Sequence, residues 1–179
     1  MNFILLLTSF FFLTHPGHTI NFGQQTGGDD WRALNDGVMG GLSQGTVSFS
    51  NESLIFKGAV SLENNGGFAS VRSPYQTMDL SGFKKIKIRC KATGQNFAFT
   101  MENYQRWYMP YYKKSIDIPQ GEWTTVEIEL RDFDTYRVGQ NMGEKPSDEM
   151  LAKVIRLGFV NTGKKSGDFQ LEIDYIEFM

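Results

Sequence analysis

Alternating apolar and polar side chains mark most of the chain from residue 46 onward. Ile86, Ile88 and Cys90 are separated by lysine and arginine residues along residues 83–92. A period of two places the apolar side chains on one face of a β-strand and the charged ones on the other. The pattern therefore predicts a half-buried strand at 83–92, with the Cys90 thiol in the core and not available as a nucleophile.

The same alternation predicts further strands, separated by turns rich in glycine and asparagine. They are expected at residues 46–50, 53–61, 68–73, 96–102, 123–130, 154–160 and 169–178, the last two as a hairpin. Residues 107–118 are aromatic and contain Pro110, which indicates an edge strand or a loop with short pairing. Many short strands of this kind predict an all-β fold, an antiparallel β-sandwich of jelly-roll type.

Residues 133–153 interrupt this succession of strands. We interpret residues 133–147 as a long polar connection that contains glycine and proline. Ser147 is then expected to cap one or two helical turns ending at Lys153, because its hydroxyl can accept a hydrogen bond from the first turn. The sequence predicts at most this one short helix.

The N-terminus has a different composition from the rest of the chain. Residues 4–13 are mostly apolar, with the length of a signal-peptide core and too short to cross a bilayer comfortably. No lysine or arginine precedes them. We expect residues 1–18 to be a signal peptide cleaved near Gly17 to Thr19, residues 19–179 to be a single domain, and the protein to be secreted or periplasmic. An uncleaved membrane anchor and a buried first strand are the alternatives.

Few residues suited to catalysis are present. The formal net charge of the 179 residues is -2, so no charge excess points to nucleic acid. The two histidines are His15 and His18, inside or beside the expected signal peptide. Histidine triads, histidine-ligated zinc and histidine general bases are therefore not expected in the domain. Cys90 is the one cysteine, which excludes an intrachain disulfide. The composition favours a protein that is not an enzyme.

One stretch has the spacing of a phosphate-binding loop. Gly158, Gly163 and Lys164 match its glycine and lysine positions, but Lys165 stands where serine or threonine would bind magnesium. An expected strand follows in place of a helix, so no helix N-terminus is available to hold phosphate. We predict a turn between strands, with no nucleotide and no cofactor.

Acidic residues leave two possibilities open. Asp132 and Asp134 lie close together in an expected turn, and a hydrolase with two catalytic carboxylates stays a third functional hypothesis. Asp29, Asp30 and Asp36 have oxygens that suit calcium but lack the spacing of an EF-hand loop. A structural calcium ion therefore stays open, and no metal ligand is assigned.

The aromatic segment at residues 104–112 is the richest candidate binding surface. Tryptophan, tyrosine and arginine are enriched at protein interfaces, and aromatic rings also stack on sugars. Half of these rings could simply be part of the core, as expected for Trp107 or Tyr108. The candidate contacts to a ligand or partner are Arg72, Tyr104, Arg106, Trp107, Tyr111 and Tyr112.

Two segments carry a longer and more specific signature. Residues 31–45 are Trp-Arg-Ala-Leu-Asn-Asp-Gly-Val-Met-Gly-Gly-Leu-Ser-Gln-Gly. Residues 56–72 are Phe-Lys-Gly-Ala-Val-Ser-Leu-Glu-Asn-Asn-Gly-Gly-Phe-Ala-Ser-Val-Arg. Together they closely resemble the N-terminal hallmark of the complex I intermediate-associated protein 30 family. A looser resemblance runs from about residue 22 to the end of the chain.

The resemblance implies a galactose-binding-like domain, related in shape to carbohydrate-binding modules, that binds and does not catalyse. The mitochondrial members of the family are assembly chaperones for respiratory complex I. An export signal in place of a mitochondrial presequence would separate this chain from complex I. The resemblance therefore transfers a binding role and no particular pathway.

Polar residues of the signature are expected to meet. Asn35, Asp36, Glu63, Asn64 and Arg72 lie in or beside expected turns, where their side chains can satisfy backbone amides. We expect one buried polar network across neighbouring loops, with a scaffold role favoured over ligand binding.

Two functions follow from these observations. The leading hypothesis is an exported, noncatalytic domain that binds a protein partner as an assembly or scaffolding factor. It depends on the signature, on the missing histidines and on the aromatic segment around Arg106. The alternative is a carbohydrate-binding module that recognises a neutral glycan. Contact with a membrane is expected only if the N-terminal segment is not cleaved.

Overall fold

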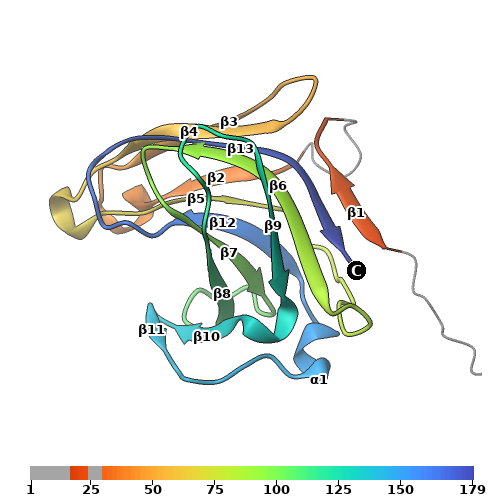
Figure 1. The fold of residues 1–179 in the computed structure, drawn as a ribbon. Helices are drawn as coiled ribbons and strands as arrows, with labels where there is room; N and C mark the ends of the chain where they lie inside the picture. The colour runs from red at the N-terminus through yellow and green to blue at the C-terminus, as the bar shows by residue number, and fades with distance from the viewer. Residues whose placement is uncertain (1–16, 24–29) are drawn as a thin grey trace, which may run out of the picture.

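A computed structural model describes residues 17–23 and 30–179 as two stacked sheets of antiparallel strands (Figure 1). Sheet A is six-stranded, with the order β3-β4-β13-β6-β9, and β1 pairs with β13 beyond the end of β4. Its strands are β1 (His18–Asn21), β3 (Gln44–Phe49), β4 (Leu54–Val60), β6 (Lys85–Thr93), β9 (Thr124–Glu129) and β13 (Gly167–Phe178).

Sheet B is seven-stranded, with the order β11-β10-β8-β7-β12-β5-β2. Its strands are β2 (Arg32–Asn35), β5 (Ala69–Arg72), β7 (Phe97–Glu102), β8 (Tyr111–Ile116), β10 (Asp134–Arg137), β11 (Gln140–Asn141) and β12 (Arg156–Asn161). The helices are α1 (Asp148–Leu151) and the short 3-10 turns Asp36–Met39, Glu63–Asn65 and Leu130–Asp132. The predicted all-β sandwich of jelly-roll type, with one short α-helix, is confirmed.

The predicted signal peptide lies outside the described residues except for its last two positions. His18 begins β1 and pairs with Phe178 near the end of the chain. Within the described ranges, no helix is long and apolar enough to cross a membrane.

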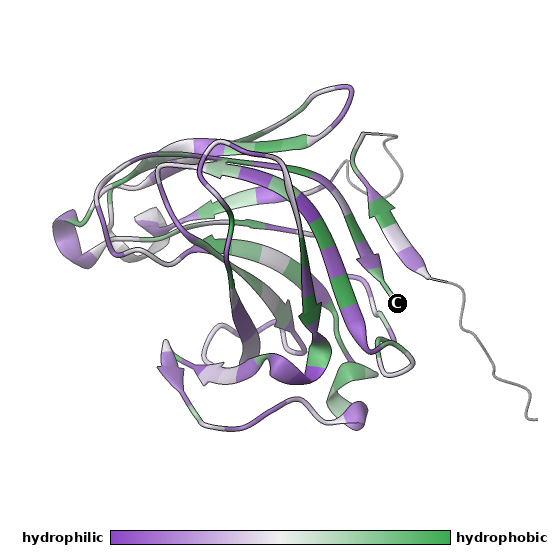
Figure 2. Cartoon of the chain, in the orientation of Figure 1, coloured by the Kyte–Doolittle hydropathy of each residue, from purple (hydrophilic) through white to green (hydrophobic). Residues whose placement is uncertain are grey.

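The hydrophobic core lies between the two sheets. Figure 2 shows the alternation of hydrophobic and hydrophilic residues along β6, as predicted. Phe99 of sheet B packs edge-on against Phe159, with ring centroids 5.0 Å apart, and against Phe133. Cys90 is fully buried on β6, and burial raises the pKa of its thiol to about 12, so the prediction of a core thiol is confirmed.

Three predictions about the strands were wrong. β12 and β13 do not form a hairpin, because β12 belongs to sheet B and β13 to sheet A, so the loop between them crosses the sandwich. β8 is not an edge strand: it lies between β7 and β10. Pro110 precedes its first residue and therefore removes no hydrogen bond from the ladder. The polar connection at 133–147 contains β10 and β11.

Ser147 caps α1 as predicted, because its hydroxyl accepts a hydrogen bond from the backbone N–H of Met150 at 3.3 Å. The stretch that resembled a phosphate-binding loop runs through β12 and the loop before β13. Gly158 therefore lies within a strand, where no helix N-terminus is available for phosphate.

Asp36 joins the loops at one end of the sandwich. Its buried carboxylate accepts hydrogen bonds from the N–H and hydroxyl of Ser43 at 2.9 and 2.6 Å. It also accepts from the backbone N–H groups of Gly67 and Phe68 at 2.7 and 3.2 Å. A Cβ on Gly41 would stand 2.4 Å from the carboxylate, so glycine is required there. Burial raises the pKa of this carboxyl, but the hydrogen bonds outweigh burial and hold the pKa below its ordinary value.

We expect Asp36→Asn to reduce the free energy of unfolding by about 3 kcal/mol at neutral pH, because an amide cannot accept from all four donors. Because the folded-state pKa is lowered, the contribution of the carboxylate is present above the unfolded-state pKa of about 3.9 and is lost as the pH falls below it. Urea unfolding across this range measures the difference, which should shrink in acid. Asp30→Asn, at an exposed position, is the control. Equal stability of wild type and Asp36→Asn at neutral pH would contradict the account.

Candidate functional site

The outer face of sheet B, the side turned away from sheet A, is built by the same strands that supply the core. Along β7, Phe97, Phe99 and Met101 are buried between the sheets. The period of two therefore turns Thr100 and Glu102 to the outer face. The strand register that buries the apolar residues of β7 therefore also determines which of its residues lie on the outer face.

Four residues lie side by side across this face. The strand registers pair Tyr136 of β10 with Tyr111 of β8, Tyr111 with Glu102 of β7, and Glu102 with Arg156 of β12. We call these four residues the polar row. With strands about 4.8 Å apart, the row spans about 14 Å. The loop residue Tyr75 extends it, because the Arg156 guanidinium lies 4.5 Å from the Tyr75 ring centroid and donates a hydrogen bond to its hydroxyl.

Arg72 enters the row from β5 by crossing β12. Arg72 and Glu102 lie on strands that flank β12, and Gly158 of β12 is the register partner of Arg72. A Cβ on Gly158 would stand 3.2 Å from Arg72 Cγ and 2.9 Å from Thr100 Oγ1. Glycine thus leaves the space through which the Arg72 side chain lies across the strand. Arg72 Nη1 is 3.1 Å from Glu102 Oε1 at the far side.

The Glu102 carboxylate is shared by two guanidinium groups. Its second oxygen is 3.9 Å from Arg156 Nε, and Arg72 also donates from Nε to the Ser70 hydroxyl at 3.2 Å. Burial lowers the pKa of the Arg72 guanidinium, and the Glu102 charge acts in the opposite direction. The three charged groups are therefore held in a partly desolvated arrangement in which each orients the others.

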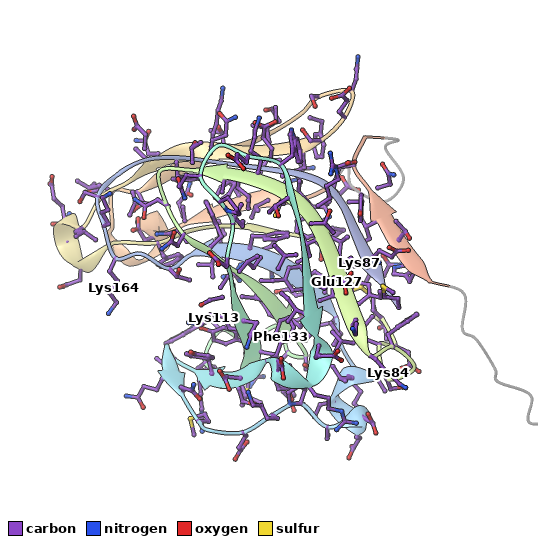
Figure 3. All side chains as sticks on the ribbon, in the orientation of Figure 1. Lys84, Lys87, Lys113, Glu127, Phe133 and Lys164 are labelled. Atoms are coloured by element: carbon purple, nitrogen blue, oxygen red, sulfur yellow. The ribbon has the colours of Figure 1, made fainter. Side chains whose placement is uncertain are left out.

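Lys113 and Tyr111 lie next to each other on the outer side of β8. Lys113 Nζ lies 3.7 Å from the ring centroid of Tyr136, a cation–π contact. Burial lowers the pKa of the Lys113 ammonium and raises the pKa of the Tyr111 hydroxyl. Figure 3 labels Lys113 on β8, with Lys87 and Glu127 on the opposite sheet.

The loop between β7 and β8 begins directly beyond the polar row. Its Trp107 is 72% exposed and meets the Tyr108 ring edge-on, with centroids 6.0 Å apart. Arg106 Nη1 donates to the Tyr108 hydroxyl at 2.8 Å, and Arg137 Nε donates to the Tyr108 carbonyl at 3.3 Å. The expectation that Trp107 or Tyr108 is part of the core was wrong, since both are exposed.

The structure separates the candidate contacts predicted from the aromatic segment. Arg72 and Tyr111 lie on the outer face, and Arg106 and Trp107 lie on the adjoining loop. Tyr104 lies on the side of the loop near Lys153, where its hydroxyl contributes to raising the pKa of the Lys153 ammonium. The prediction that Tyr112 contacts a ligand was wrong. Tyr112 is 5% exposed and points into the core, because neighbouring residues of a strand face opposite sides.

Sequence reasoning missed most of the polar row. Glu102 and Arg156 end and begin strands, and nothing in their local sequence distinguishes them from other surface charges. Tyr136 lies in a segment predicted to be a loop, and Tyr75 was not singled out. One signal was available, since Glu102 follows a clear alternation in β7 that assigns it to the face opposite the core.

Comparison with protein families shows a match over residues 20–173 to the profile of complex I intermediate-associated protein 30. The chain belongs to this family. The comparison with curated proteins found no match.

Several solved structures share the fold of this family member. A family 11 carbohydrate-binding module from a cellulosomal cellulase of Clostridium thermocellum has a TM-score of 0.67 at 16% identity, covering 93% of this chain and 95% of that one. A second structure of a family 11 module from this organism, in complex with a β-1,3-1,4-mixed-linked tetrasaccharide, has a TM-score of 0.65 at 18% identity, covering 91% and 95%. An agarase matches with a TM-score of 0.57 at 14% identity, over 89% of this chain and 24% of the agarase.

The hallmark residues of this complex I intermediate-associated protein 30 domain lie away from the polar row, with one exception. Asn35 donates to the Gly45 carbonyl and Asn64 to the Gly40 carbonyl, both at 3.2 Å, near the loops that Asp36 joins. Glu63 is exposed, against the prediction, and its carbonyl accepts from Gly66 N–H within its own turn. Arg72 does not join them, because its side chain points to Glu102 on the outer face.

Neither metal binding nor two-carboxylate hydrolysis gains support from the described residues. No group of three histidine, cysteine, aspartate or glutamate side chains suited to a metal ion occurs in the described ranges, and Asp29 lies outside them. The shifted carboxyl pKa values, those of Asp36, Asp134 and Glu149, are all lowered. A carboxyl group that donates a proton to a glycosidic oxygen needs a raised pKa.

We expect Gly158→Ala to reduce the free energy of unfolding by about 1–3 kcal/mol, because the new methyl group overlaps Thr100, Arg72 and the Val71 carbonyl. Urea unfolding measures this loss. Gly37→Ala is the matched control, since a Cβ there meets nothing within 4 Å. If both variants were equally stable, the close approach of Arg72 over β12 would be wrong.

Proposed function

We propose that this domain is a noncatalytic binding module that holds an oligosaccharide on the outer face of sheet B. The observation that carries the proposal is the polar row, in which the rings of Tyr136 and Tyr111 lie beside the Glu102–Arg156 pair. Tyr75 continues the row past Arg156, so aromatic rings border the charged groups at both ends.

The chemistry of these residues suits a sugar chain. Aromatic rings supply apolar faces for the C–H side of a pyranose, while a guanidinium and a carboxylate held in place can bond to hydroxyl groups. Because Glu102 is fixed between Arg72 and Arg156, its orientation needs no rearrangement when a ligand binds. A length of about 14 Å suits several linked sugar rings rather than one.

The fold relatives support this proposal in a general way. A family 11 module has been solved with a mixed-linked tetrasaccharide, and the fold is therefore able to hold an extended glycan. The residues of this chain carry the specific argument. The exposed ring of Trp107 lies on the loop next to the row, where it would add a further stacking surface.

We expect Tyr111→Ala and Trp107→Ala each to weaken oligosaccharide binding by about 2 kcal/mol, or about thirtyfold in Kd. Affinity electrophoresis against a panel of soluble polysaccharides identifies a ligand, and titration calorimetry measures the loss. The matched control is Trp123→Ala on the opposite sheet, whose ring lies beneath Arg89 and Lys91. Retention of full affinity by both Tyr111→Ala and Trp107→Ala, or an equal loss in Trp123→Ala, would contradict the assignment of the face.

A protein partner is the second candidate, and the exposure of Trp107 is the observation that favours it. A largely exposed tryptophan with a neighbouring arginine has the composition of an interface hot spot. In this role the domain would act as an assembly or scaffolding factor outside the cytoplasm, after export directed by residues 1–18.

For the protein partner, we expect Trp107→Ala to abolish a defined complex that the wild-type protein forms in a native extract, while Tyr111→Ala leaves it intact. Crosslinking followed by mass spectrometry identifies the partner. Loss of the complex in Tyr111→Ala but not in Trp107→Ala would contradict docking on the loop.

A further inference from the structure

The charges on the outer face of sheet B are not balanced. Arg72 and Arg156 share a single carboxylate, that of Glu102, at 3.1 and 3.9 Å. One positive charge is therefore left over inside the row. All three side chains are at most about one quarter exposed, so water compensates this charge only in part.

Lys113 adds a second uncompensated cation beside the row. Lys113 lies over the Tyr136 ring, and no carboxylate of the described residues forms an ion pair with it. Its cross-strand neighbour Asp134 is engaged by Lys145, with Nζ at 2.6 Å from the carboxylate. Burial lowers the pKa of the Lys113 ammonium, as expected for a cation that has lost water without gaining a carboxylate.

The loop between β7 and β8 and the adjacent end of β10 carry further positive charges. Arg106 and Arg137 both bond to Tyr108, to its hydroxyl and its carbonyl, and neither forms an ion pair among the described residues. Both partners are uncharged, so these guanidinium groups also keep their net charge. Cations therefore extend from Arg72 to the loop across one side of the sheet.

Along β6, on the outer face of sheet A, the cations are paired instead. There Lys85 pairs with Glu127 and Glu129, and Lys87 pairs with Glu127. Further along the same face, Arg89 pairs with Asp174 and Lys91 with Glu172. Each cation on those strands thus has a carboxylate, and the whole chain carries a net charge of -2. A positive face on a slightly acidic protein indicates a complementary ligand.

We propose that the ligand of this face is an acidic oligosaccharide whose carboxylate or sulfate group binds between Arg72 and Lys113. This proposal rests on the proposed glycan-binding function and departs from the neutral glycan expected from sequence. A guanidinium offers a planar fork to either anion, and Lys113 adds a point charge from β8. The register places Gly158 and Thr100 between these two cations. Because Gly158 lets the Arg72 side chain lie across β12, its guanidinium reaches Glu102 on β7, the strand next to Lys113.

The test uses calorimetric titration of the whole domain with three matched probes. These are an oligogalacturonate, the same oligosaccharide with its carboxyl groups reduced to alcohols, and a sulfated galactan oligosaccharide. We expect the oligogalacturonate or the sulfated probe to bind at least about tenfold more tightly than the neutral one, with the difference shrinking at high salt. The two acidic probes distinguish a carboxylate ligand from a sulfate ligand.

Variants assign the preference to the face. Lys113→Gln, which breaks no ion pair, should reduce the acidic-to-neutral ratio by about fivefold, and Arg72→Gln should reduce it further. Lys87→Gln, among the paired cations of β6, should leave it unchanged.

Three outcomes would overturn the inference in distinguishable ways. In the first, the neutral and acidic probes bind equally well and Tyr111→Ala weakens the binding of both. This result would reject the preference for an acidic ligand but would retain the outer face of sheet B as a glycan-binding site. Absence of binding to all three probes, or binding of an acidic peptide in their place, would reject the proposed function together with the inference. An equal loss of the acidic preference in Lys113→Gln and Lys87→Gln would show nonspecific attraction and would also overturn it.

Discussion

The period of two along β7, β8 and β12 is the constraint on which both the core and the candidate site depend. In each strand most residues facing sheet A are apolar, and those facing outward include Glu102, Tyr111 and Arg156. A slip of one residue would turn Phe99 and Phe159 to water and bury Glu102 with its arginines. Burial of an unpaired charge costs several kcal/mol and the lost aromatic burial adds to it, so the register is firmly fixed. The packing of the core therefore also places the polar row.

Around that row, the outer face combines close backbone packing with unsatisfied charge. Arg72 lies across β12 only because Gly158 carries no side chain, and the crossing brings two guanidinium groups to one carboxylate. A partly exposed ion cluster of this kind contributes modestly to stability. Its distinctive property is that Arg72 and Arg156 are held by a common partner and still carry net positive charge, which is the condition for recognising an anion.

Local patterns predicted the elements well and the site poorly. The strand containing Cys90 and the cap at Ser147 were predictable, because alternation and capping are properties of neighbouring residues. β10 and β11 were missed because they are short and mostly polar, and β11 lies at the sheet edge. The pairing of Arg72, Glu102 and Arg156 depends on strand order, which brings together residues from three distant parts of the chain. The segment that contains Tyr111 was predicted as a binding surface, but the uncertain register of β8 hid the fact that Tyr112 faces the core.

The central claim, that ligand binds on the outer face of sheet B, is tested most directly by nuclear magnetic resonance. An amide-labelled sample is titrated with an acidic oligosaccharide and chemical-shift changes are mapped onto the strands. The account predicts changes concentrated in β7, β8 and β12, with a shift of the Trp107 indole N–H. Changes confined to the outer face of sheet A, around Trp123, or to the loops joined by Asp36 would contradict it.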